Sequence, residues 1–182
     1  MTTYVALLRG INVGGHKRIA MARLRALLAD LGYTDVRTHL QSGNAIFDST
    51  TRSSDKVASA IEGRIAGELD LEVIVIVRTG DEMAAVVNGN TLVTSAIDPT
   101  KMLVAFLSAK PDPTRLRDID PTGYEPEMFE VAAREIYMWC PNGQIASEIV
   151  GVFSEKRLGV DVTVRNWRTV TKLAELAGAS SG

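Results

Sequence analysis

Glycines and basic residues gather directly after the first apolar run of the chain. The segment Leu8-Arg9-Gly10-Ile11-Asn12-Val13-Gly14-Gly15-His16-Lys17-Arg18 follows a strand-like run and precedes a helix-like run that begins near Met21. A turn of this composition presents bare backbone N–H groups beside cations, which favours an anion. It approaches the phosphate-loop pattern, but the lysine is displaced by one position and no Ser or Thr follows to hold magnesium. The sequence therefore predicts binding of a phosphate-bearing ligand, without support for nucleotide hydrolysis.

Apolar periodicity predicts the elements that must position this segment. In the first half, the expected strands and helices follow the order β-α-β-β-α-β. They cover Tyr4–Leu8, Met21–Leu31, Val36–Leu40, Ala45–Phe47, a helix capped by Ser53 or Ser54 that ends near Leu69, and Leu71–Val77. This order is the split βαβ or ferredoxin-like arrangement. A second, more degenerate copy is expected over Met102–Leu107, Pro113–Asp118, Met128–Ala132, Glu135–Cys140, Ile145–Leu158 and Val160–Val164, with a final helix over Trp167–Ala177. The prediction is an α+β fold with a ferredoxin-like subdomain at residues 1–80, a linker with a short helix at 81–100, and a second subdomain plus C-terminal helix at 101–182.

The predicted topology brings a second polar segment to the glycine-rich turn. In a split βαβ unit, strands one and two point the same way, so the turns that follow them emerge at one edge of the sheet. Gln41-Ser42-Gly43-Asn44 has the composition of a hairpin turn after strand two. Near the C-terminus, Arg165 and Trp167 open the last helix and could bind an anion or stack on a base. The candidate ligand-binding residues are Arg9, Asn12, Gly14, Gly15, Lys17, Gln41, Ser42, Asn44, Arg165 and Trp167.

Each of these residues also has an ordinary structural interpretation. The glycines can simply supply positive φ angles, and Asn12 can hydrogen-bond its own loop. Arg9 can form a buried salt bridge, while Lys17 and Arg18 can be solvated. Asn166 can cap the last helix, with Trp167 as its anchor on the core. These alternatives stay open at the level of the sequence.

The sequence contains no catalytic or metal-binding motif. A nucleophile elbow, a zinc-binding helix and a redox cysteine pair are absent, and Cys140 at the end of an apolar run is expected to be a buried structural thiol. His16 and His39 lack a third ligand for a metal ion. No cofactor, metal or catalytic residue is therefore predicted. An enzyme of unknown reaction, with Asn12, Gln41 or Ser42 as polar contacts, and a non-catalytic scaffold remain alternatives to a binding protein.

Composition limits the partners that the protein can have. The chain of 182 residues has a formal net charge of −2, which argues against a protein that coats nucleic acid. The first forty residues are nevertheless locally basic, so a small phosphate-containing molecule or a nucleic acid end remains a suitable partner. No secretory signal and no apolar stretch of roughly twenty residues is visible, which predicts a cytoplasmic protein that does not enter a membrane. The sequence does not predict an oligomeric state.

Several motifs together resemble the DUF1697 family of uncharacterised bacterial proteins. They are the N-terminal segment Tyr4–Gly15, Leu31-Gly32-Tyr33, Gln41-Ser42-Gly43-Asn44, and Arg165-Asn166-Trp167 with Thr169-Val170 and Lys172-Leu173. The resemblance spans nearly the whole chain and implies a pair of ferredoxin-like subdomains, but no established activity. The chain departs from the family pattern in two places. His16-Lys17-Arg18 replaces the usual Lys-Asn-Lys type of segment and keeps its basic character, and Glu148 stands where a lysine is common, which argues against an anion contact there.

Overall fold

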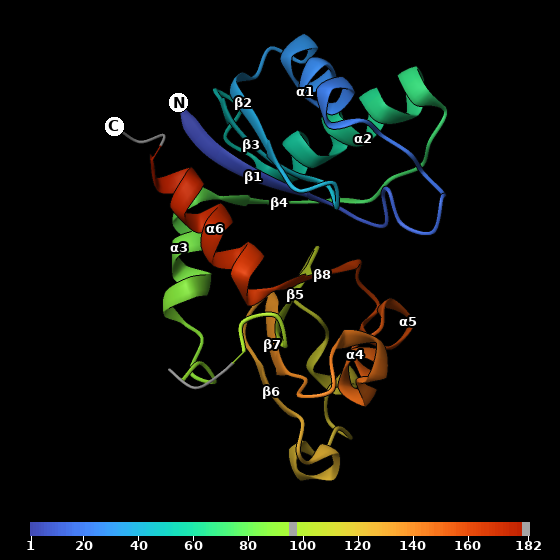
Figure 1. Cartoon of the computed structure of the whole chain (residues 1–182), viewed down its shortest axis with the longest axis vertical. Coiled ribbons are helices and arrows are strands. Elements are labelled where there is room, and N and C mark those ends of the chain that lie inside the picture. The colour runs from blue at the N-terminus through green and yellow to red at the C-terminus, as the bar shows by residue number, and fades with distance from the viewer. Residues whose placement is uncertain (95–97, 180–182) are drawn as a thin grey trace. The chain divides into compact units, whose positions relative to one another are not determined.

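The computed structural model describes residues 1–94 and 98–179 and has an α+β fold with two four-stranded antiparallel sheets (Figure 1). Residues 95–97 of the predicted linker and residues 180–182 at the C-terminus lie outside the described residues. The described chain forms two compact units, one of residues 1–85 and 172–179, the other of Val86–Thr171. The division runs through two helices, α3 (Gly80–Asn88) and α6 (Trp167–Gly178). Within the described ranges, no helix is long and apolar enough to cross a lipid bilayer.

The first unit has the predicted element order. Its elements are β1 (Thr2–Leu8), α1 (Met21–Asp30), β2 (Thr34–His39), β3 (Asn44–Ser49), α2 (Ser54–Leu69) and β4 (Val75–Thr79). The strand order is β2-β3-β1-β4, and all neighbours are antiparallel. The prediction placed the fourth strand at Leu71–Val77, too early in the chain. Strand β4 begins only at Val75, which lies opposite Leu8 at the end of the pairing with β1.

Helices α1 and α2 cover one face of the first sheet (Figure 1). Leucines of α1 and β-branched residues of α2 recur at helical spacing, so each helix buries one stripe against the strands. The buried residues of the two helices are Leu24, Leu27, Leu28, Val57, Ile61 and Ile65. On the sheet side, Tyr33 stacks on Phe47 with ring centroids 4.5 Å apart. This core fixes the ends of β1 and α1, between which the glycine-rich segment lies.

The second unit repeats the strand order with less helix. Its elements are β5 (Met102–Leu107), β6 (Met128–Val131), β7 (Glu135–Trp139), α4 (Glu148–Val152), α5 (Glu155–Leu158) and β8 (Val162–Asn166), in the sheet order β6-β7-β5-β8. Short 3₁₀ turns occupy Pro113–Arg115, Pro121–Tyr124 and Gln144–Ala146.

Two helix predictions in the second unit were wrong. The expected single helix over Ile145–Leu158 is divided into a 3₁₀ turn, α4 and α5. Ser147 starts α4 by accepting a hydrogen bond from Val150 N at 3.2 Å, and Phe153 ends it with a ψ of 44°. The segment Pro113–Asp118 contains only a three-residue 3₁₀ turn.

Equivalent backbone hydrogen bonds relate the two units as internal repeats. At the end of β1, Leu8 N donates to Gly43 O at 2.8 Å, and at the end of β5, Leu107 N donates to Arg134 O at 2.9 Å. The repeats differ after these strands. In the first unit the chain forms a long loop and helix α1, whereas in the second it forms 3₁₀ turns.

Candidate functional site

The segment between β1 and α1, residues 9–20, folds back on itself as a small hairpin, here called the β1–α1 loop. Asn12 N donates to Lys17 O at 3.1 Å and closes the hairpin. The turn at its tip contains Gly14 and Gly15, with φ angles of +61° and +80°. Two successive left-handed residues are typical of a type I′ turn and strongly favour glycine. These two glycines therefore have the turn role that the sequence offered as an alternative.

The side chain of Asn12 connects three parts of the site. Its Nδ2 donates to Ile19 O at 2.9 Å and to Gln41 O at 2.7 Å, and its Oδ1 accepts from Ile19 N at 2.9 Å. Both polar atoms of the amide are thus used within the protein. Asn12 closes the β1–α1 loop and attaches it to the turn between β2 and β3.

The β2–β3 turn, residues 40–43, packs directly against the β1–α1 loop. Gly43 O accepts the hydrogen bond from Leu8 N, and a Cβ atom at Gly43 would lie 2.7 Å from Ile11 Cδ1. The predicted convergence of the two segments at one sheet edge is therefore confirmed by backbone and side-chain contacts.

Asn44 stabilises the β2–β3 turn from within. Its side chain is fully buried, and Nδ2 donates to His39 O at 2.8 Å and to Ser42 Oγ at 3.1 Å. Asn44 is therefore part of the frame rather than of the surface. Burial and, to a smaller extent, the charge of Lys172 lower the pKa of His39. The His39 imidazole is consequently neutral at pH 7 and adds no positive charge.

An open pocket of about 440 Å³ lies where the loop, the turn and helix α1 meet. Its walls combine a free guanidinium, a side-chain amide and backbone of the glycine turn. The lining residues are Asn12, Gly15, Arg18, Ile19, Ala20 and Gln41. The pocket thus includes Asn12, Gly15 and Gln41 of the predicted candidates.

Helix α1 begins at this pocket without a side-chain cap. Its N-cap is Ala20, and its first turn contains no acidic residue. The N–H groups of Met21, Ala22 and Arg23 have no acceptor in residues 1–94 or 98–179, whereas Leu24 N donates to Ala20 O at 3.0 Å. Among the described helices of eight residues or more, the others are capped by Ser53 in α2, Thr79 in α3 and Asn166 in α6. The partial positive charge at the start of α1 is therefore uncompensated by any group in the described part of the chain.

The cation that faces the pocket is Arg18. The ammonium group of Lys17, a predicted candidate, is engaged elsewhere in the protein, because its Nζ donates a hydrogen bond to Glu72 O at 2.6 Å. The exposed Arg18 has no hydrogen bond or ion pair within the described residues, and its Nη2 would lie 3.8 Å from a Cβ atom at Gly15. The candidates predicted from the sequence include Lys17 but not Arg18, and of these two adjacent cations only Arg18 lines the pocket. No local signal in the sequence distinguishes Arg18 from Lys17, because the partner of Lys17 lies at Glu72.

Arg165 and Trp167 belong to the second unit, where both are buried. Arg165 Nη1 donates to Thr163 Oγ1 and to Val164 O, each at 2.9 Å, and burial lowers the Arg165 pKa to about 10. Asn166 Oδ1 caps helix α6 by accepting from Thr169 N at 3.0 Å. The interpretation of Asn166 as a helix cap is thus confirmed, and Trp167 is buried at the start of the same helix.

Cys140 is fully buried, and burial raises the pKa of its thiol to about 11. Because the reactive form is the thiolate, we expect Cys140 in the native protein to resist a thiol reagent at pH 7. Labelling with Ellman's reagent in buffer and in denaturant measures this directly. Rapid labelling in buffer would contradict the assignment as a structural thiol.

The family model described as "Protein of unknown function (DUF1697)" matches residues 1–137. The chain belongs to this family. Among solved structures, a conserved bacterial protein from Streptococcus pneumoniae is similar, with a TM-score of 0.76 and 21% sequence identity over 97% of this chain and 98% of that chain. At this identity the likeness concerns the fold alone. A comparison with curated proteins gives no match.

Proposed function

We propose that this DUF1697 protein binds a phosphate-bearing ligand in the pocket between the β1–α1 loop and the β2–β3 turn. The observation that carries the proposal is the uncapped start of α1 beside the unpaired Arg18 guanidinium. A phosphate supplies the acceptors that the first-turn N–H groups lack, and its charge suits both the helix dipole and the guanidinium. Gly15 N–H and the Gln41 side chain complete the set of donors around it.

The other candidates act as the frame of this proposed site. Asn12, Lys17 and Asn44 use their side chains to hold the loop and the turn, so they position Arg18 and Gly15 instead of contacting the ligand. Because the Asn12 amide is bound on both polar atoms, binding is better supported than an enzymatic role for Asn12.

We also propose that each unit is a ferredoxin-like subdomain. In the first unit, the order β1-α1-β2-β3-α2-β4 and the sheet order β2-β3-β1-β4 support this assignment. The second unit has the equivalent sheet order, with short 3₁₀ and α-helical segments in place of the long helices.

Titration with inorganic phosphate tests the binding proposal. A charge-assisted hydrogen bond contributes about 1.5–3 kcal/mol, so Arg18→Ala should weaken phosphate binding by about tenfold or more. Arg25→Ala is the matched control, because it removes the same charge from a guanidinium that is bound to Thr38 Oγ1 at 2.7 Å. Amide NMR shifts in α1 and the loop would report the site and the affinity. Unchanged affinity in Arg18→Ala would refute the proposal.

A further inference from the structure

The C-terminal half of helix α6, from Lys172 onward, belongs to the first unit together with β2 and the start of α3. Leu173 and Ala177 of this half are fully buried. A Cβ atom at Gly80, the first residue of α3, would lie 3.5 Å from Ala177 Cβ. The end of α6 is therefore packed within the first unit and is not a free tail.

Arg37 of β2 holds this end of α6. Its Nη2 donates a hydrogen bond to Leu176 O at 3.2 Å and also forms an ion pair with Asp35 Oδ2 at 3.2 Å. Leu176 O is one of the last four carbonyls of the helix, which a helix leaves without an intrahelical donor, and the C-terminal end of a helix attracts a cation. Asp35, at φ +49°, lies where the register of β2 against β3 shifts, and such bulges re-aim side chains.

His39 and Lys172 come next along the same strand and the same helix. Arg37 and His39 are two positions apart on β2, and Lys172 and Leu176 are four positions apart on α6, so each pair lies on one face of its element. Two strand residues span about 6.6 Å and four helix residues about 6 Å, so the two spacings match. After burial, the charge of Lys172 is the second cause that lowers the pKa of His39. A proton on His39 therefore adds a second cation beside Lys172.

We propose that the attachment of the end of α6 to β2 is an acid-sensitive latch, in which Arg37 anchors the helix and protonation of His39 beside Lys172 loosens it. The other charged groups on these faces are Asp35, which pairs with Arg37, and Glu175, which accepts from Lys172 Nζ at 2.8 Å. Histidine is the side chain whose ordinary pKa lies between pH 5 and 8.

The direction of the pH dependence follows from the lowered pKa of His39. The attached helix favours the neutral imidazole, because burial and Lys172 both oppose the proton. The contribution of His39 to the latch is therefore complete above the ordinary histidine pKa of about 6.5, and it is lost as the pH falls through the lowered pKa. None of the residues that line the proposed phosphate pocket takes part in the latch.

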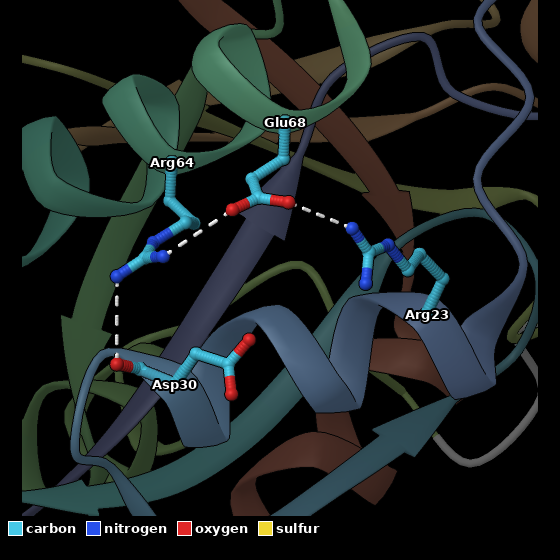
Figure 2. A network of polar contacts seen from close by, with 4 residues as sticks. All are labelled: Arg23, Asp30, Arg64 and Glu68. Carbon is cyan, nitrogen blue, oxygen red and sulfur yellow. Dashed lines mark hydrogen bonds and ion pairs between the residues drawn. The ribbon is translucent and has the colours of Figure 1, made fainter.

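Helix α1 provides an internal reference, because a network without histidine attaches it to α2 (Figure 2). Glu68 of α2 receives Arg23 of α1 at 2.8 Å and Arg64 of its own helix at 3.5 Å. Arg64 also donates to Asp30 O of α1 at 3.5 Å. This attachment contains carboxylate, guanidinium and backbone groups, so no histidine titration acts on it.

Amide hydrogen exchange, measured by NMR on the full chain at pH 7.5 and 5.5, tests the latch. Protection factors, which remove the pH dependence of the intrinsic exchange rate, are compared for residues 172–177 and for α1. We expect the protection of residues 172–177 to fall by about twofold or more at the lower pH, and that of α1 to stay constant. Arg37→Gln should lower the protection of residues 172–177 by about threefold or more at both pH values.

Two histidine variants identify the titrating group. His39→Gln should abolish the pH response of residues 172–177. His16→Gln is the matched control and should keep the response, because His16 is the other histidine of the chain and is exposed in the β1–α1 loop. An NMR titration of the His39 ring in the parent protein covers the case in which His39→Gln misfolds. Its midpoint should lie below about 6.5 and should rise in Lys172→Gln.

Four results would each overturn the latch. They are a pH response that persists in His39→Gln, an equal loss of protection in α1 and α6, a His39 midpoint that Lys172→Gln does not move, and unchanged protection of residues 172–177 in Arg37→Gln. Loss of the response in His16→Gln would assign the titration to the wrong histidine and would refute the proposal as well.

Discussion

Replacing Gly43 by alanine is expected to lower the free energy of unfolding by about 2–5 kcal/mol. The new Cβ atom would lie 2.7 Å from Ile11 Cδ1, 2.8 Å from Ile11 Cγ1 and 2.9 Å from Leu8 Cβ. Both neighbours are fully buried, so neither side chain can move aside freely. Overpacking a core costs about 1–3 kcal/mol, and the left-handed backbone of Gly43, at φ +86°, adds about 1–2 kcal/mol for alanine.

Gly10→Ala is the matched control for this prediction. Gly10 also has a positive φ, +64°, but a Cβ atom there meets nothing within 4 Å. Gly10→Ala should therefore lower the free energy of unfolding only by the cost of the left-handed backbone, about 1–2 kcal/mol. Urea unfolding followed by circular dichroism compares the two variants. Equal destabilisation would mean that Gly43 is kept for its φ angle and not for the contact between turn and loop.

The sequence was sufficient to predict the place of the candidate site. Apolar spacing indicated the strands of the first unit, and the topology of a split βαβ unit placed the Gln41–Asn44 turn beside the glycine-rich loop. The contacts at Gly43 and Asn12 confirm that juxtaposition. This part was predictable because it depends on strand direction, which the order of the elements determines.

The assignment of individual side chains was not predictable, because their partners are distant in the sequence. Lys17 reaches Glu72 O, fifty-five positions away, and this bond leaves Arg18 as the cation at the pocket. Nothing in the local sequence distinguishes these two neighbours. The same holds for Arg165, whose burial depends on the packing of the second unit.

The two repeats explain why the proposed site occurs in the first unit. Both units end their first strand with equivalent hydrogen bonds, from Leu8 and from Leu107. Only the first continues through a long loop into a ten-residue helix, whereas residues 108–127 of the second are irregular chain with two short 3₁₀ turns. A helix N-terminus is needed to collect N–H groups around an anion, so we expect one phosphate per chain at this type of site.

Asn12→Ala is expected to cost about 2–4 kcal/mol of stability and to abolish phosphate binding. Three hydrogen bonds of the amide are lost, two with Ile19 and one with Gln41 O. Each contributes about 0.5–1.5 kcal/mol, and alanine is less suited than asparagine to the φ of +57°. The loop then separates from the turn, and Arg18 and Gly15 lose their fixed positions. Denaturant unfolding and phosphate titration measure the two effects.

Gln41→Ala distinguishes two roles of residue 41: its backbone oxygen, which holds the loop and the turn together, and its side chain, which is proposed to contact the ligand. Asn12 bonds to the backbone oxygen of Gln41, which the substitution retains, and the exposed side chain can be removed at a cost within about 0.5 kcal/mol. If Gln41→Ala is stable but binds phosphate weakly, the side chain contacts the ligand. If Asn12→Ala is as stable as the parent protein yet fails to bind, Asn12 is itself a ligand contact, and its role as the clamp between loop and turn is wrong.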